Sequence, residues 1–212
     1  MENNAYKEKL AEYLLQIKAI QLNTHEPFTW ASGLKSPVYC DNRKLLSYPD
    51  VRNFVKDGLV SLVKEYFPTT ECIAGVATAG IPHGAMIADA LNLPFLYVRS
   101  KPKEHGLTNM IEGDLKHGQR VLVVEDTIST GGSSLKAVQD LRAAGAEVIG
   151  MIAIYKYGFE SAKQKFEDEG VMLKTLTNYD FLVRVAQQGN YITKEESAAL
   201  NSWRSNPQEW GN

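Results

Sequence analysis

The sequence has little of what marks several large classes of protein. Its 212 residues include only two cysteines, Cys40 and Cys72, with no CxxC pair, which argues against a disulfide framework. No apolar run approaches the ~18 residues that a membrane helix needs, and the charged N-terminus is unlike a signal peptide. The formal net charge is −2, too small for a general basic surface that would bind nucleic acid. We therefore expect a cytoplasmic protein with reduced thiols and no nucleic-acid or membrane partner.

Familiar catalytic and nucleotide-binding motifs are missing as well. The sequence contains no GxGxxG, no GxSxG and no metal-ligand spacing of histidine, cysteine and carboxylates. Residues 75–80, GVATAG, resemble the start of a P-loop, but Ile81 and Pro82 stand where a lysine and a Ser/Thr should follow. These absences argue against a dinucleotide site, a nucleoside-triphosphate site, a structural zinc and a covalent nucleophile. The GVATAG loop itself is compatible with a tight turn or with a close approach of backbone to a phosphate.

Hydrophobic periodicity predicts an α/β fold. Strand and helix patterns alternate from residue 50 to residue 176, which favours a mostly parallel central sheet flanked by helices on both faces. The expected strands are 28–31, 38–40, 72–77, 95–98, 121–124, 148–154 and 171–176. The expected helices are 5–22, 50–66 with Asp50 as N-cap, 82–91, about 135–145, 161–169, 178–187 and one from 193 onward. Capping boxes, SAKQ and TKEE, open the helices at 161 and 193.

These elements predict a single domain over residues 1–212. Residues 1–49 contribute a helix and a small hood subdomain, about 50–176 the core sheet, and 178–206 the C-terminal helices. Ligands of such sheets bind at the carboxyl ends of the strands, where the strand order reverses. The loops at 77–81, 99–109 and 125–133 are therefore the candidate binding loops.

The stretch at residues 120–134, RVLVVEDTISTGGSS, predicts a site for a phosphorylated sugar. A buried strand, Val121 to Val124, is followed by two carboxylates, Glu125 and Asp126, and then by hydroxyls and glycines that lead into a helix. Backbone N–H groups at the helix start can hold a phosphate, and the carboxylates can accept hydrogen bonds from sugar hydroxyls. A plain turn with a serine N-cap is the simpler alternative, but the acid pair favours the sugar site.

A second polar stretch covers residues 99–118 and shows little periodicity. Arg99, Lys101, Lys103 and His105 alternate along it, so in an extended loop they can converge on one polyanion. A solvated basic loop is the usual alternative. The neighbouring candidate loops favour a cationic flap over a phosphate site.

The sequence around the acid pair resembles the phosphoribosyl-pyrophosphate (PRPP) motif of type I phosphoribosyltransferases. Two further segments, FTWASGLKSPVYCDNR at 28–43 and RSKPKEHG at 99–106, narrow the resemblance to the orotate phosphoribosyltransferases in the form found in Gram-positive bacteria. The resemblance covers nearly the whole chain. It implies the type I phosphoribosyltransferase fold, a homodimer with shared sites, Mg²⁺ as cofactor, and PRPP and orotate as substrates that give orotidine 5′-phosphate and pyrophosphate.

The same resemblance implies roles for individual residues. Catalytic roles fall to Lys103, His105 and Asp126, and Ser129 also contacts orotate. The residues implied in PRPP binding are Arg99, Lys103, His105, Glu125, Asp126, Thr127, Ile128, Ser129, Thr130, Gly131, Gly132 and Ser133. No residue is implied as a direct metal ligand, since PRPP and water mainly hold the Mg²⁺. The anomeric centre reacts through an oxocarbenium-like transition state, so the cations need only stabilise the departing pyrophosphate.

Some positions depart from the family pattern. Certain members have lysines where Ala31, Ala79 and Ser100 stand, and an arginine that contacts orotate aligns with Tyr157. Lys35, Arg43 and Lys156 are the nearby cations that can replace it at the orotate carboxylate. A PRPP-binding regulatory protein and another base phosphoribosyltransferase are the alternative functions.

Overall fold

The central element is a six-stranded sheet in the part of the chain that the computed structural model describes, residues 4–30, 33–101, 110–208 and 210. Its strand order is β10-β9-β8-β5-β6-β7, and every neighbouring pair is parallel except β6 and β7. The strands are β5 (Cys72–Val76), β6 (Phe95–Val98), β7 (Ile111–Glu112), β8 (Arg120–Ile128), β9 (Glu147–Lys156) and β10 (Leu173–Asn178). The predicted mostly parallel sheet is confirmed.

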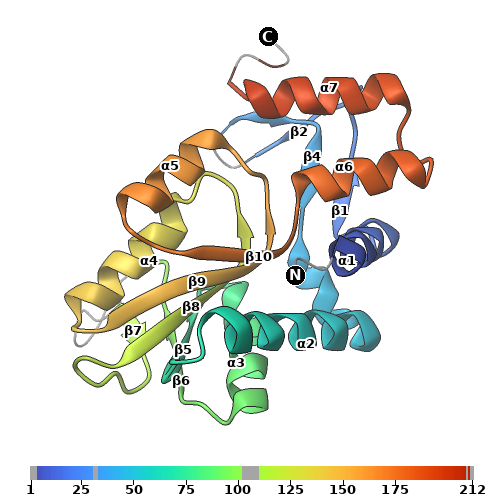
Figure 1. Ribbon diagram of the computed structural model, residues 1–212. Coiled ribbons are helices and arrows are strands. Elements are labelled where there is room, and N and C mark those ends of the chain that lie inside the picture. The colour runs from blue at the N-terminus through green and yellow to red at the C-terminus, as the bar shows by residue number, and fades with distance from the viewer. Residues whose placement is uncertain (1–3, 31–32, 102–109, 209, 211–212) are drawn as a thin grey trace.

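Helices cover both faces of this sheet (Figure 1). Helices α2 (Pro49–Tyr66) and α3 (Gly80–Leu91) lie on one face, and α4 (Gly132–Ala143) and α5 (Glu160–Asp168) on the other. Alternate residues of β8 enter two separate cores: Leu122 and Val124 join the first cluster, Val121 and Val123 the second. Because β8 is buried on both faces, its sequence reads as a continuous apolar run.

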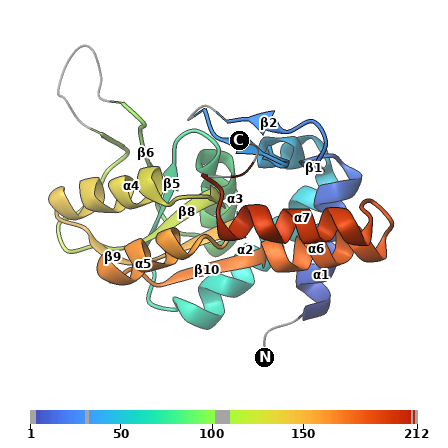
Figure 2. The ribbon, with the colours of Figure 1, turned by 90° about the horizontal axis from the view of Figure 1, so that it is seen from above.

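The remaining elements form the end of the molecule next to β10. Helices α1 (Asn4–Gln16), α6 (Tyr179–Gln188) and α7 (Lys194–Ser205) pack there. The hood consists of β1 (Ile20–Leu22), β2 (Phe28–Thr29), β3 (Lys35–Ser36), β4 (Val38–Cys40) and the 3₁₀ helix η1 (Asn42–Ser47), and Figure 2 shows it beside α7. We use "hood" for the described residues of 20–47.

An aromatic cluster attaches the hood to the rest of the fold. The buried Trp203 of α7 donates its indole N–H to the carbonyl of Lys35 at 3.2 Å. Trp30 packs edge-on against Trp203 and against Tyr157, with ring centroids 5.9 and 5.1 Å apart. Aromatic pairs of this kind stabilise a contact beyond the area that they bury. They hold the hood over the carboxyl end of the sheet.

The strand order reverses between β5 and β8. The chain passes from β5 to β6 on one side, then returns to place β8 on the other side of β5. The loops that follow β5 and β8, and the described start of the loop after β6 at 99–101, therefore lie at one end of the sheet, as predicted for 77–81 and 125–133; residues 102–109 of the third predicted loop lie outside the described residues. Such a reversal leaves a crevice in which ligands of open α/β sheets bind.

The elements differ from the sequence prediction mainly at their ends. The helix expected over 5–22 stops at Gln16, because Lys18 adopts a left-handed φ of 54° and residues 20–22 pair with β4 instead. The strand expected over 121–124 continues to Ile128, since β9 keeps pairing with it. Helix α4 begins at Gly132 rather than near Leu135. The 99–118 segment is not wholly irregular, since it contains β7.

Some of the predicted helix N-caps were wrong. SAKQ is no capping box, because α5 already begins at Glu160 and places Ser161 inside the helix. Tyr48, not Asp50, is the N-cap of α2, with Pro49 in the first helical position. The TKEE box is confirmed, since Thr193 and Glu196 exchange both hydrogen bonds of the motif. Among the described residues, no helix combines the length and the apolar character that crossing a membrane requires.

Candidate active site

The acid pair lies where β8 extends beyond β5. The pairing of β5 with β8 ends at Gly75 and Val124, whereas β8 stays paired with β9 as far as Ile128 and Lys156. Glu125 and Asp126 are thus inside a strand, not after it, but one edge of that strand is free of a neighbouring strand at this point. The backbone is held on the β9 side while the β5 side is available for other groups.

Glu125 is buried and its carboxylate is held from two directions. One oxygen accepts the backbone N–H of Asp126 at 3.0 Å, and the other accepts the hydroxyl of Ser134 at 3.3 Å. Burial, and then the neighbouring charge of Asp126, raise the pKa of Glu125 well above its usual range. Glu125 therefore holds a proton more strongly than a free glutamate does when nothing positive is bound beside it.

Asp126 is only half-buried and connects to the hood. Its carboxylate accepts the Thr127 hydroxyl at 3.1 Å. The Asn42 amide of η1 donates to the Asp126 carbonyl at 3.2 Å and to the Thr127 hydroxyl at 2.9 Å. Two segments more than 80 positions apart in the sequence thus meet at the backbone carbonyl of Asp126 and at the Thr127 hydroxyl beside its carboxylate.

The loop after β8 brings small residues against the start of α4. Gly131 is the N-cap residue with φ +77°, and a Cβ there would lie 2.9 Å from the Phe166 ring, so the position favours glycine on two grounds. Ser129 is half-buried, and Thr130, Gly132 and Ser133 are exposed. As Gly131 offers no capping side chain, the first N–H groups of α4 are available to an anion.

Ile128 differs from the other residues predicted to bind phosphate. Its side chain is buried in the second core cluster. Only its backbone can contribute to a ligand at this loop.

The loop after β5 packs directly on the acid pair. A Cβ on Gly80 would lie 2.4 Å from the carbonyl oxygen of Val124, and one on Gly75 would lie 2.8 Å from the carbonyl oxygen of Gly80. The glycines of GVATAG therefore permit the loop to lie against β8. The sequence is compatible with a tight turn or with a close approach of this backbone to a phosphate. The contacts among the described residues are those of a tight turn packed against β8.

The predicted cationic loop is only partly described. Arg99 follows β6 and forms an ion pair with Glu112 of β7 at 3.1 Å, while its Nε donates to the Lys101 carbonyl. Lys103 and His105 lie outside the described residues. The structure thus places the base of this loop beside β5, one strand away from the acid pair.

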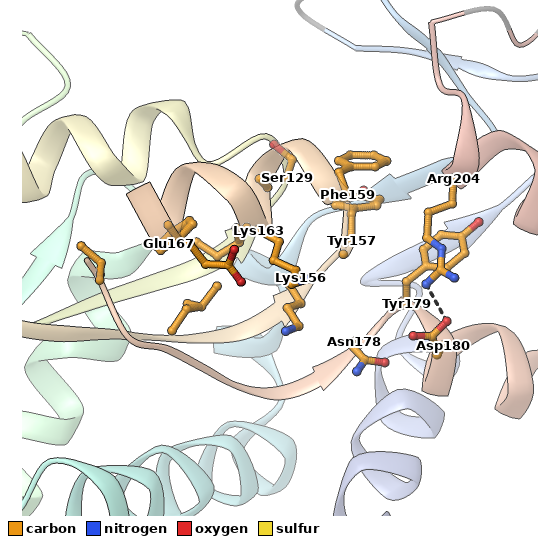
Figure 3. A pocket seen from close by; sticks show the side chains of 16 residues that line it. Ser129, Lys156, Tyr157, Phe159, Lys163, Glu167, Asn178, Tyr179, Asp180 and Arg204 are labelled. Carbon is orange, nitrogen blue, oxygen red and sulfur yellow. Dashed lines mark hydrogen bonds and ion pairs between the residues drawn. The ribbon is translucent and has the colours of Figure 1, made fainter. Parts of the chain in front are cut away.

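A cavity of about 410 Å³ opens beside Ser129 (Figure 3). Tyr157 and Phe159, whose rings stack at 5.6 Å, line it together with Lys156. Figure 3 shows the Arg204–Asp180 ion pair at its other side.

The other cations considered for the orotate carboxylate lie elsewhere. Lys35 donates to the Thr29 hydroxyl, and Arg43 pairs with Asp41 at 2.6 Å. Lys156 is thus the one of the three that shares the cavity with Ser129. Ala31 lies outside the described residues.

Sequence reasoning gave no role to three polar residues at this site. Asn42 and Cys40 come from the hood, with the Cys40 sulfur 3.5 Å from the Thr127 hydroxyl, and His83 of α3 is buried. Burial lowers the pKa of His83 to about 4, against the opposing effect of Asp126, so its ring is neutral. No spacing rule could connect these residues to the acid pair, because hood and strand meet only in the folded chain.

The described residues contain no cluster of three or more His, Cys, Asp or Glu side chains suited to a metal ion. Two adjacent carboxylates beside a loop of hydroxyls and N–H groups instead suit a ligand that brings its own phosphate oxygens. Mg²⁺ is commonly bound in this way, through one or two carboxylates together with substrate phosphates and water.

Known proteins resemble the chain along most of its length. The family model for the phosphoribosyl transferase domain matches residues 53–188. The orotate phosphoribosyltransferase of Bacteroides fragilis is 60% identical over 200 residues, which are 94% of each chain. The crystal structure of orotate phosphoribosyltransferase from Aeropyrum pernix is 30% identical, with a TM-score of 0.75, over 87% of this chain and 99% of that one.

A further solved structure contains PRPP. The Mycobacterium tuberculosis orotate phosphoribosyltransferase in complex with PRPP is 25% identical, with a TM-score of 0.65. The similarity covers 83% of this chain and 98% of that one.

The raised pKa of Glu125 predicts how replacing this residue changes the melting temperature. A carboxyl whose pKa is raised in the folded state favours folding below its unfolded pKa of about 4.5, and that contribution is lost as the pH rises through the folded value. We expect Glu125→Gln to melt at a higher temperature than the parent at neutral pH, with the difference vanishing below pH ~4.5. In a chain of this size a gain of 1 kcal/mol corresponds to about 2–4 °C.

Thermal melts between pH 4 and pH 8 measure this difference. Glu147→Gln, at an exposed glutamate of β9, is the matched control and should show no pH-dependent gain. A lower melting temperature for Glu125→Gln at neutral pH would contradict the argument.

Proposed function

The chain belongs to the orotate phosphoribosyltransferases of pyrimidine biosynthesis, and on that premise we propose which of its residues bind the two substrates, PRPP and orotate. The family match over residues 53–188 and the 60% identity to the Bacteroides fragilis enzyme support the premise. The observation that carries the proposal is the position of the acid pair at the strand reversal, followed directly by the hydroxyl- and glycine-rich segment at 127–133. This is where open α/β sheets bind their ligands.

PRPP binds along the carboxyl end of β8. Glu125 and Asp126 accept hydrogen bonds from the two ribose hydroxyls. The 5′-phosphate lies in the loop from Thr127 to Ser133, where the N–H groups at the start of α4 and the helix dipole favour an anion. Ile128 takes part through its backbone alone.

Orotate lies on the Ser129 side of the ribose. Ser129 is half-buried at the mouth of the cavity that Tyr157 and Phe159 line, and a planar ring fits against such aromatic walls.

The pyrophosphate leaves toward the loop after β6. Arg99, Lys103 and His105 supply the charge that stabilises it, and His105 can donate a proton or a hydrogen bond to the departing oxygen. The ion pair between Arg99 and Glu112 supports this assignment, because it holds the guanidinium at the root of the loop.

Mg²⁺ fits the donor set of the site. We propose that PRPP oxygens and water mainly hold the ion, with Glu125 and Asp126 as the carboxylates beside it. When bound, it neutralises charge that develops on the pyrophosphate. Positive charge beside Glu125 would also favour the ionised form of that carboxyl.

We also propose a homodimer in the cytoplasm. The resemblance of the 99–106 segment supports a shared site, in which part of this loop reaches the neighbouring subunit. The two cysteines are free thiols, which fits a reducing compartment.

A direct assay tests the function. Protein, orotate, PRPP and Mg²⁺ are mixed and the ultraviolet absorbance of orotate is followed, with Asp126→Asn as the site variant. We expect an absorbance change that Asp126→Asn strongly reduces. A change with a purine base but none with orotate would select the alternative enzyme, and PRPP binding without turnover of any base would select the regulatory protein.

Lys103 should affect the reaction rather than the fold. We expect Lys103→Ala to lose at least ~100-fold in turnover, because one electrostatic donor typically contributes about 3 kcal/mol to lowering such a barrier. Lys116→Ala, at an exposed lysine of the same segment, serves as the control. Near-normal turnover of Lys103→Ala, measured in the orotate assay at saturating substrate, would remove Lys103 from the mechanism.

Mixing two inactive variants tests the shared site. Lys103→Ala and Asp126→Asn subunits, dissociated and reassembled together in equal amounts, should recover about a quarter of the parent activity if Lys103 acts across a two-fold interface. Half of the dimers are then mixed, and each mixed dimer has one intact site. Recovery of no activity, with mixed dimers verified by mass spectrometry, would place Lys103 in the site of its own subunit.

A further inference from the structure

Asn42 is a buried amide whose two hydrogen bonds both end on the acid strand. It begins η1, directly after the hood strand β4, and it is fully buried. Its Nδ2 donates to the Asp126 carbonyl at 3.2 Å and to the Thr127 hydroxyl at 2.9 Å. The proposed roles of the acid pair do not include this residue.

The two hydrogen bonds extend to the Asp126 carboxylate. The Thr127 hydroxyl has one hydrogen, which it donates to Oδ2 of Asp126 at 3.1 Å. Its lone pairs are therefore free to accept from Asn42 and from the Cys40 thiol at 3.5 Å. Burial raises the pKa of Cys40 to about 12, so the thiol keeps its hydrogen. Hydrogen bonds in such a chain polarise one another, which strengthens the last one.

Asn42 occupies the place of a strand partner. On the β5 side, pairing with β8 stops at Val124, so the Asp126 carbonyl has no strand neighbour there. The amide of Asn42 supplies the missing donor without covering the carboxylates with another strand. A strand carbonyl without a neighbouring strand is satisfied by such a partner.

The orientation of the amide shows that it serves the acid strand rather than its own packing. Both donated bonds require Nδ2 to face β8, because the flipped amide would turn its oxygen toward the Asp126 carbonyl. Oδ1 is then buried with no hydrogen-bond partner among the described residues. A buried polar atom left unpaired is costly and calls for an explanation.

We propose that Asn42 is a positioning residue, which acts through Thr127 to fix the Asp126 carboxylate and so couples the hood to the PRPP site. The inference rests on the proposed binding of the ribose by Asp126. When the hood is seated, the carboxylate points in one direction; without the amide, Thr127 and Asp126 are free to rotate. A catalytic geometry that depends on orientation loses rate when its groups are misplaced by about 1 Å.

Calorimetric titration with PRPP and Mg²⁺, followed by the orotate assay, tests the role. We expect Asn42→Ala and the isosteric Asn42→Asp each to lower PRPP affinity or kcat/KM by about tenfold to a hundredfold. Asn42→Asp keeps the shape but replaces the N–H donor by an acceptor. Leu45→Ala is the matched control, because Leu45 is equally buried in η1 but its apolar side chain donates no hydrogen bond to Asp126 or Thr127; the change should lower the melting temperature.

A double-mutant cycle separates positioning from damage to the fold. If Asn42 acts through Asp126, Asn42→Ala should cost far less in an Asp126→Asn background than in the parent. Equal losses in both backgrounds, or Asn42 variants that melt early but bind PRPP normally, would overturn the proposal. PRPP binding is measured separately from turnover. If the orotate assay alone fails, that result counts against the proposed function, and the PRPP affinities in the double-mutant cycle still test the positioning role of Asn42.

Discussion

The unequal lengths of β5 and β8 are the constraint on which the site depends. β9 holds β8 as far as Ile128, while β5 leaves it at Val124, so four residues of a central strand have one open edge. A central strand of a parallel sheet is normally covered on both faces and paired on both edges, and such packing would bury these residues completely. The chain turns away after β5 through a loop that Gly80 allows to lie against Val124. The open edge of β8 thus results from the unequal lengths of β5 and β8 and from the absence of a Cβ at Gly80.

The acid pair is also a point where folding and function oppose each other. Burial beside Asp126 raises the pKa of Glu125, which favours the protonated form, whereas the ribose and Mg²⁺ that we propose for this site would favour the carboxylate. Sites that place like charges together are less stable than their surroundings allow. The rigid support for this arrangement comes from elsewhere: the apolar clusters on both faces of β8 and the aromatic contacts that hold the hood.

Local patterns in the sequence predicted what is local in the fold. The alternation of strands and helices and the box at Thr193 both depend on residues a few positions apart, and the structure has them. Apart from the N-caps of α2 and α5, the errors arise where segments distant in the sequence pair. Pairing with β4 converts residues 20–22 from helix to strand, and pairing with β9 lengthens β8 past the acids. The contact of Asn42 with Asp126 belongs to the same class, since nothing in either segment alone predicts it.

A side chain, rather than a longer β5, completes the edge of β8. The reason is the space over the carboxylates that a ligand needs. Two more residues on β5 would satisfy the Asp126 carbonyl, but their own carbonyls and side chains would lie over the carboxylates. One amide satisfies the same carbonyl and a hydroxyl while occupying the width of a single side chain. It also comes from the hood, which Trp30 and Trp203 anchor beside the cavity at Ser129. The amide that bonds to the acid strand therefore belongs to a segment packed on the aromatic rings of the cavity, so that a displacement of the hood would affect both the acid pair and this cavity.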